Sequence, residues 1–283
     1  INKVLKNKDE QILIVAPTRE LAIQIDQEFK DLSRGMGLFS VCCVGGVNIV
    51  GQLKELRYFN NFIIGTPGRL KDLIERGQIR LEKFKTIVLD EADQMLDMGF
   101  INDMKYLVAK MPEVRHTLFF SATLSPEIER LIGSFLNNPA RVMVKTRDTS
   151  KDVEQDVVRI GPGMNKAEVL IDLLKQDGFD KVIIFCKTKH GAEKLSNHLI
   201  KAGIKAESIH GDKVHRQRQR ALEMFKSHHV QALVATDVAA RGLDISGVSH
   251  VINFDLPSTY TDYVHRIGRT GRAGKKGMAL TFI

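Results

Sequence analysis

One short apolar run of the sequence ends in three acids. It leads directly into Asp90, Glu91 and Asp93. Ligands of open α/β sheets bind beyond the carboxyl ends of the strands, and adjacent carboxylates at such a place suit Mg²⁺ and the activation of an attacking water. Acids are also favoured in the first turn of any helix, so a merely acidic helix start is the alternative.

Two hydroxyl residues follow a second apolar run. Ser121 and Thr123 come directly after the strand predicted over His116–Phe120. Small hydroxyls that lie beside carboxylates can form a hydrogen-bonded relay. The alternative is that they only cap the helix that begins near Pro126.

A third cluster joins a histidine to three arginines, in the stretch His265-Arg266-Ile267-Gly268-Arg269-Thr270-Gly271-Arg272. Glycine allows the backbone to approach a partner closely, and arginine can stabilise the charge that develops on a transferring phosphoryl group. We therefore favour anion binding over a solvated basic loop or a simple RNA-binding patch.

The elements that must position these groups alternate along the chain, because Val- and Ile-rich runs are separated by amphipathic stretches. Strands are predicted over 12–16, 40–44, 62–65, 86–89, 116–120, 140–145, 182–186, 206–209, 232–235, 250–254 and 277–282. Helices are predicted over 20–33, 68–76, 100–110, 126–136, 166–175, 190–201 and 216–225. This alternation predicts the α/β class, with mostly parallel sheets flanked by helices.

The two halves of the sequence repeat each other. A strand that ends near Thr18 is followed 48 positions later by one that ends near Thr66, and Thr188 and Thr236 have the same spacing. This predicts two copies of one topology. A polar stretch between them sets the predicted organisation, which is a first domain at 1–146, a linker at 147–152 and a second domain at 153–283.

The composition indicates a folded protein and favours one kind of binding partner. The chain has 283 residues, 43% of them hydrophobic, and a formal net charge of +8, which is ordinary for folded domains. The charge is +2 over 1–146 and +6 over 147–283, which favours an anionic partner, nucleic acid first. Three cysteines without a CxxC pair indicate a reducing, cytoplasmic location. No apolar run is long enough to cross a membrane.

Eight ordered segments resemble the motifs of the DEAD-box family of superfamily 2 RNA helicases. They are PTRELA at 17–22, Gly45-Gly46, TPGR at 66–69, DEAD at 90–93, SAT at 121–123, VIIFCKT at 182–188, ATDVAARGLDI at 235–245 and HRIGRTGRAG at 265–274. HGDK at 210–213 and RQRAL at 218–222 are similar to the small bacterial RhlE-type branch. The resemblance implies two tandem RecA-like domains, ATP and Mg²⁺ as cofactors, single-stranded or duplex RNA as partner, local duplex unwinding, and a monomer.

The resemblance also implies roles for individual residues. Asp90 would hold Mg²⁺ through water, Glu91 would activate the hydrolytic water, and interdomain coupling would involve Asp93, Ser121, Thr123 and His265. ATP would be met by the arginine fingers Arg269 and Arg272, by Asp244 at the ribose, and by Gly242. The RNA backbone would be held by Pro17, Thr18, Arg19, Gly46, Thr66, Gly68, Arg69, Thr188, Arg218 and Thr236. Contacts to the RNA backbone imply that binding depends only weakly on the RNA sequence.

The sequence departs from the family in places that bear on activity. The P-loop AxTGxGKT and the glutamine motif should stand before Ile12, yet the eleven residues there contain no glycine. His215 stands where the family usually has Gln, and the chain stops before the usual final helix. We therefore expect a fragment that is inactive as written. The alternative function is an ATP-independent RNA-binding or annealing module, while a DNA-directed helicase is disfavoured by the DEAD and SAT pairing.

Overall fold

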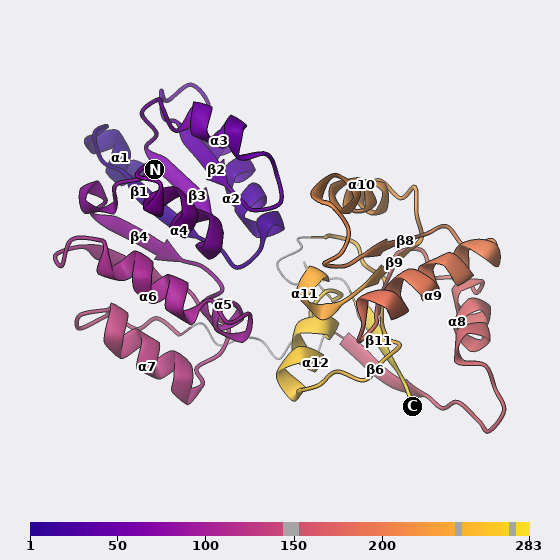
Figure 1. Ribbon diagram of the computed structural model, residues 1–283. Helices are drawn as coiled ribbons and strands as arrows, with labels where there is room; N and C mark the ends of the chain where they lie inside the picture. Colours follow the sequence, from indigo (N-terminus) through magenta and orange to yellow (C-terminus); the bar gives the residue numbers. More distant parts are fainter. Residues whose placement is uncertain (144–152, 241–244, 272–275) are drawn as a thin grey trace. The chain divides into compact units, whose positions relative to one another are not determined.

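The computed structural model describes residues 1–143, 153–240, 245–271 and 276–283. They form two compact units, Ile1–Val142 and Met143–Ile283 (Figure 1). Each unit has a parallel sheet and hydrophobic cores of its own. The predicted linker at 147–152 lies outside the described residues.

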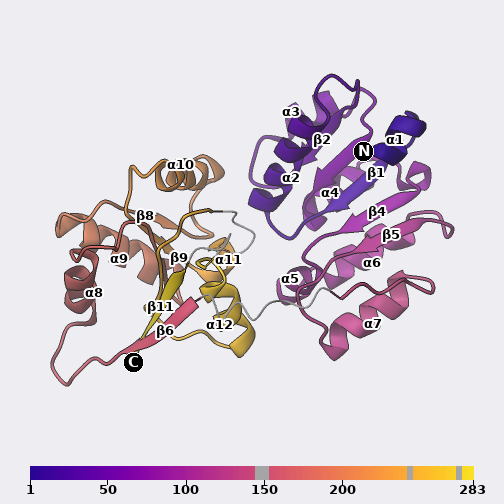
Figure 2. The same cartoon turned by 180° about the vertical axis from the view of Figure 1, so that it is seen from behind.

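The first unit is built on a five-stranded parallel sheet with the order β2-β3-β1-β4-β5. The chain's first strand lies at the centre, because Ile12 is opposite both Phe62 and Thr86. Figure 2 shows β5 beside β4 at one edge of the sheet. The strands are β1 (Ile12–Val15), β2 (Ser40–Cys43), β3 (Phe62–Gly65), β4 (Thr86–Leu89) and β5 (His116–Phe119).

Helices pack on both faces of the first sheet. One face is covered by α1 and α2 through residues such as Val4 and Phe29, and the opposite face by α4 to α7 through residues such as Leu70 and Leu107. Strands buried on both faces read as continuous apolar runs, which explains Phe62–Gly65. The helices are α1 (Asn2–Lys6), α2 (Arg19–Leu32), α3 (Ile49–Glu55), α4 (Pro67–Glu75), α5 (Ala92–Asp97), α6 (Ile101–Ala109) and α7 (Pro126–Phe135), with a 3-10 turn at Leu81–Lys83.

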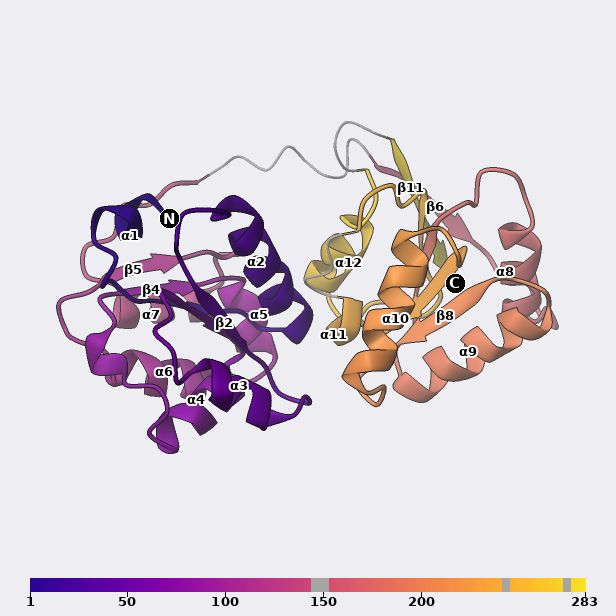
Figure 3. The same cartoon turned by 90° about the horizontal axis from the view of Figure 1, so that it is seen from above.

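The second unit has a six-stranded parallel sheet with the order β6-β11-β10-β7-β9-β8. Its strands are β6 (Val153–Val158), β7 (Val182–Phe185), β8 (Ala206–Ile209), β9 (Ala232–Ala235), β10 (His250–Asn253) and β11 (Gly277–Phe282). One core lies under α8 and α9 and another under α10 and α11, on opposite faces of the sheet (Figure 3). The helices are α8 (Lys166–Leu174), α9 (Lys189–Lys201), α10 (His215–Lys226), α11 (Asp237–Ala240) and α12 (Tyr260–Ile267).

The two sheets share one topology. The order β8-β9-β7-β10-β11 in the second unit repeats β2-β3-β1-β4-β5 in the first, and β6 is added beyond β11. Equivalent backbone bonds recur: the Asp90 N–H donates to the Val15 carbonyl (3.0 Å) and the Asp255 N–H to the Phe185 carbonyl (3.1 Å). The predicted repeat and the predicted α/β class are therefore confirmed. Because all strands are parallel, the carboxyl ends of each sheet lie along one edge.

One predicted strand is absent from the described part of the structure, and one strand of the structure was not predicted. The strand predicted over 140–145 has no regular structure over 140–143, and residues 144–145 lie outside the described part. Residues 141–143 do not pack against the sheet. Val142 is 86% exposed, and Arg141 forms an ion pair with Glu129 of α7 (2.9 Å). Conversely, β6 was not predicted, because an edge strand with mostly exposed side chains carries no apolar alternation. Within the described residues, no helix is long and apolar enough to span a bilayer.

Candidate functional site

The acidic segment starts where β4 ends. Asp90 is half-buried, and its Oδ1 accepts a hydrogen bond from the Glu91 N–H (3.0 Å). Burial raises the pKa of the Asp90 carboxyl above its usual range; the Glu91 N–H opposes this shift and the charge of Asp93 adds to it. A carboxylate held in this way attracts positive charge more strongly than an exposed one does.

Glu91 adopts a backbone conformation that residues other than glycine rarely adopt. Its φ of 48° and ψ of 53° lie in the left-handed region. The residue forms a sharp turn between β4 and α5, which begins at the next residue. Such strain persists only where the surroundings fix it, and it concentrates at functional sites.

Asp93 fastens the acidic segment to the hydroxyl segment. Its Oδ2 accepts hydrogen bonds from both the backbone N–H and the Oγ1 of Thr123, each at 3.0 Å, and Asp93 is only 7% exposed. Ser121 donates instead to the Thr123 carbonyl (2.8 Å). The alternative reading, in which these hydroxyls only cap a helix, is wrong, because the Oγ of Ser125 caps α7.

Arg19 and Gly46 form a close pair at the ends of β1 and β2. Thr18, just before Arg19, is the N-cap of α2 and accepts the Leu21 N–H (3.2 Å). A Cβ added to Gly46 would overlap the guanidinium of Arg19, and Gly46 has a φ of +71°. The positive φ therefore favours glycine here, and any larger residue would also displace the Arg19 guanidinium. Pro17, beside Thr18, is buried.

A buried glutamine connects this pair to the segment after β3. Gln52 of α3 is 6% exposed; its Nε2 donates to the Val44 carbonyl (3.0 Å) and its Oε1 accepts from Arg69 Nη1 (2.9 Å). Thr66, before α4, is also buried, whereas Gly68 is exposed. Sequence reasoning missed Gln52, because a polar residue on the inner face of a helix gives no periodic signal. Its signal would have been its place one turn into the helix after Gly45-Gly46.

The second unit presents the equivalent edge. Thr188 is exposed and caps α9, where its Oγ1 accepts the Gly191 N–H (2.9 Å). Thr236 is buried, and its N–H donates to the Ile209 carbonyl (3.3 Å). Arg218 lies on α10, which begins at His215.

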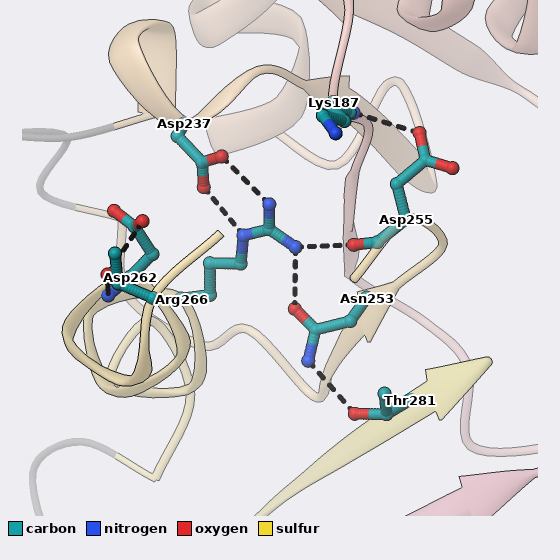
Figure 4. Close-up of polar contacts among 8 residues, drawn as sticks. Lys187, Asp237, Asn253, Asp255, Asp262, Arg266 and Thr281 are labelled. Atoms are coloured by element: carbon teal, nitrogen blue, oxygen red, sulfur yellow. Dashed lines mark hydrogen bonds and ion pairs between the residues drawn. The ribbon is translucent and has the colours of Figure 1, made fainter. Parts of the chain in front are cut away.

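The arginine-rich segment divides between a helix and the loop that follows it. His265 and Arg266 belong to the last turn of α12, and Arg269 follows the helix, with its N–H bonded to the Arg266 carbonyl (3.1 Å). Arg266 is 2% exposed and makes a bidentate pair with Asp237 at 2.6 and 2.8 Å (Figure 4). Gly242, Asp244 and Arg272 lie outside the described residues.

The structure therefore gathers the predicted residues into two edges, one in each unit. The first edge carries Pro17, Thr18, Arg19, Gly46, Thr66, Gly68, Arg69, Asp90, Glu91, Asp93, Ser121 and Thr123 at or just beyond the carboxyl ends of β1 to β5. The second carries Thr188 and Thr236 in the same way, while His265 and Arg269 lie at the end of α12 and Arg218 within α10. Ligands of parallel α/β sheets bind beyond the carboxyl ends of the strands, so each edge by itself is a candidate binding surface.

Two tandem RecA-like units with these motifs define a class of nucleotide-dependent nucleic-acid proteins. Residues 1–131 match the family described as DEAD/DEAH box helicase, and residues 165–274 match the helicase conserved C-terminal domain. The chain belongs to the DEAD/DEAH box helicase family.

Relatives and solved structures agree with this assignment. The chain is 44% identical over 279 residues to the ATP-dependent RNA helicase CshA of Limosilactobacillus reuteri, covering 98% of the chain and 56% of the relative. It is 45% identical over 280 residues to CshA of Geobacillus kaustophilus, covering 99% and 60%. It resembles S. cerevisiae Dbp5 bound to RNA and ADP BeF3, with 31% identity, a TM-score of 0.85, and coverage of 97% of the chain and 71% of Dbp5.

A further structure is similar over the whole chain. Mss116p bound to ssRNA and AMP-PNP has 29% identity, a TM-score of 0.82, and coverage of 100% of the chain and 61% of Mss116p. The chain spans a little over half the length of these curated CshA relatives. The RhlE-type branch stays a prediction, because the relatives named above are CshA proteins.

Proposed function

We propose that the chain provides the two motor domains of an ATP-dependent RNA helicase, which couples ATP hydrolysis to RNA binding and local duplex unwinding. The observation that carries this proposal is the pair of bonds from Thr123 to Asp93, because they fix the strained Asp90–Glu91 turn beside the hydroxyl segment. Positioned charges of this kind are the main contribution that a protein makes to phosphoryl transfer.

The acids fit a Mg²⁺ ion that is held mainly by water and phosphate. One oxygen of Asp90 accepts the Glu91 N–H, and within the described part of the chain the other makes no hydrogen bond. No three His, Cys, Asp or Glu side chains among the described residues are grouped to hold a metal by themselves. Mg²⁺ usually takes one or two carboxylates together with waters and phosphates, so Asp90 would hold it and the ion would neutralise phosphate charge.

The remaining residues would act on water, phosphate and RNA directly. Glu91 would orient and deprotonate the attacking water, and Arg269 would stabilise the charge on the transferred phosphoryl group. RNA would be held along its backbone by the two strand-end edges, with Thr18 and Thr188 as equivalent contacts. Backbone contacts position nucleic acid without reading its sequence, so binding would be largely sequence-independent.

ATP turnover tests the proposal directly. Residues 1–283 contain no GxxxxGK[ST] segment, so we propose that this polypeptide alone does not hydrolyse ATP above the level of its Glu91→Gln variant. A form extended ahead of Ile12 by a P-loop segment should show ATPase activity that single-stranded RNA stimulates. Glu91→Gln in that form should keep ATP binding and abolish turnover. RNA-independent turnover, or turnover that survives Glu91→Gln, contradicts the proposal.

A further inference from the structure

Arg266 is an arginine of the His265–Arg272 segment whose contacts a simple ligand-binding role does not explain. Its guanidinium is buried, and its polar contacts are with the protein itself (Figure 4). Nε and Nη2 pair with the two oxygens of Asp237, at 2.6 and 2.8 Å. Nη1 donates to the Asn253 side chain (3.2 Å) and to the Asp255 carbonyl (2.6 Å). The group also lies 5.0 Å above the centre of the Phe185 ring.

These contacts connect segments that lie far apart in the sequence. Asp237 starts α11 and directly follows Thr236, while Arg266 lies on α12 beside His265. Asp255 follows β10, and its Oδ2 accepts the Lys187 N–H (2.8 Å) beside Thr188. Asn253 extends the connection to β11, because its Nδ2 donates to Thr281 Oγ1 (3.1 Å). One side chain thus ties α12 to the ends of β7, β9 and β10.

We propose that Arg266 is a positioning residue that holds the RNA-facing and nucleotide-facing sides of the second domain in one geometry. The inference rests on the proposed function, which places Thr188 and Thr236 at RNA and Arg269 at the phosphoryl group. Arg269 follows Arg266 by one helical turn, so a shift of α12 against Asp237 displaces it relative to Thr236. The strand ends and the arginine loop keep their spacing only while this connection is intact.

The chemistry of the contacts requires arginine. A guanidinium is planar and donates hydrogen bonds in several fixed directions. Two of its N–H groups point in parallel at the Asp237 carboxylate, and another nitrogen donates to Asn253 and Asp255. Lysine preserves the charge but has no planar fork, so it cannot fill these positions together. Removing either charge of a buried pair leaves the other uncompensated, so Asp237→Asn is expected to resemble Arg266→Met.

The test compares Arg266→Lys, Arg266→Met and Asp237→Asn with Lys181→Met. Lys181 is a matched control because it is a second buried cation of the same domain, 3% exposed, and its Nζ donates to the Lys226 (3.4 Å) and Ser246 (3.1 Å) carbonyls. It precedes β7 and therefore lies at the opposite end of that strand from Thr188. Loss of a buried cation is common to both sites, whereas the proposed coupling belongs only to Arg266.

Two measurements are made on each full chain. The first is hydrogen exchange of the amides of Ala239, Ala240 and Gly268, which close α11 and α12. The second is the affinity for a fluorescein-labelled single-stranded oligo(U) as a function of salt. We expect Arg266→Lys to speed exchange at both helices together, to weaken binding about tenfold and to lower the log-log salt slope by about 0.7 for each phosphate that is no longer bound. Adding Asp237→Asn should cause no further loss.

The outcomes separate this inference from the proposed function. If exchange rises at both helices but no chain binds oligo(U), the unsubstituted chain included, the helicase proposal fails and the positional coupling stands. If Arg266→Lys leaves exchange at α11 unchanged, the inference is overturned. It is also overturned if Lys181→Met lowers the salt slope as much as Arg266→Lys does, because the effect then reflects general destabilisation of the domain.

Discussion

Thr18 and Thr188 occupy equivalent positions in the two domains and have the same backbone conformation. Each has a φ of −121°, with a ψ of 155° for Thr18 and 150° for Thr188. Each accepts a hydrogen bond from the N–H three residues further on, at 3.2 and 2.9 Å. They differ in exposure, because Thr18 is buried and Thr188 exposed. The repeat therefore preserves the helix cap while the accessibility of its hydroxyl changes.

Gly46→Ala is expected to impair RNA binding much more than Gly77→Ala. The two glycines have almost the same positive φ, +71° and +69°, so the backbone strain of about 1–2 kcal/mol is common to both. At Gly46 a new Cβ would occupy the position of the Arg19 guanidinium, whereas at Gly77 it would meet no other atom. RNA titration and thermal unfolding of both variants check this. Equal losses of RNA affinity in the two variants would show that the strain alone matters.

Thr123→Val should lower the stability of the first domain and hold the Asp90–Asp93 segment less firmly. It removes the 3.0 Å bond from Oγ1 to Asp93 but keeps the bond from the backbone N–H. We expect the free energy of unfolding to fall by about 1.5–3 kcal/mol, as for hydrogen bonds to a charged group. Urea denaturation measures this, with Thr117→Val on β5 as the control. Combined with Asp93→Asn, the two losses should not add. Additive losses would mean that the two residues act independently.

Asp90→Asn is expected to stabilise the first domain at neutral pH while removing the proposed metal ligand. Burial raises the folded pKa of Asp90 above its usual range, so the ionised form is less favourable in the folded than in the unfolded chain. The gain should be about 1 kcal/mol and should shrink as the pH falls through that folded pKa, since both side chains are then neutral. Thermal melts at several pH values, with exposed Asp9→Asn as the control, would reveal this. A loss of stability at neutral pH would contradict it.

Glu193 should make the second domain sensitive to acid. The hydroxyl of Ser208, then His210 and Lys213, lower the pKa of its carboxyl to about 2 from an ordinary 4.5. As the pH falls below 4.5, the unfolded chain binds the proton first, so stability is present above that pH and is lost between 4.5 and about 2. The side chain is 43% exposed, so solvent reduces the effect. Glu193→Gln should flatten this part of the stability profile, whereas Glu223→Gln should not.

The fold was predictable where one face or both faces of an element are apolar. Phe62–Gly65 is apolar throughout and is the predicted β3, and the strong amphipathic spacing at 126–136 marks α7 to within one residue. Helix α5 was missed because its first residues belong to the acidic motif, and α12 because its last turn was taken for a loop. Short segments with functional side chains violate the apolar spacing on which such predictions depend.

The candidate site was predictable as a set of residues but not as a set of contacts. Sequence spacing placed Asp93 and Thr123 near one sheet edge, and the structure joins them directly. It gave no sign that Arg69 lies against Gln52, or that Arg266 points inward rather than at a ligand. Whether a polar side chain faces solvent or the interior depends on packing partners distant in sequence, so local patterns cannot specify it.

The pairing of β6 with β11 has a consequence for the synthesis of the chain. Among the strands that the structure describes, β6 comes first in the second sheet and pairs with β11 alone, with Val153 opposite Gly277. A nascent chain can pair β1 to β5 once β5 has left the ribosome, since the described pairings of these five strands involve no later residues. In contrast, β6 has no partner until translation reaches β11. We therefore expect the first sheet to form while the second is still being made, and β6 to remain an unpaired strand until β11 emerges.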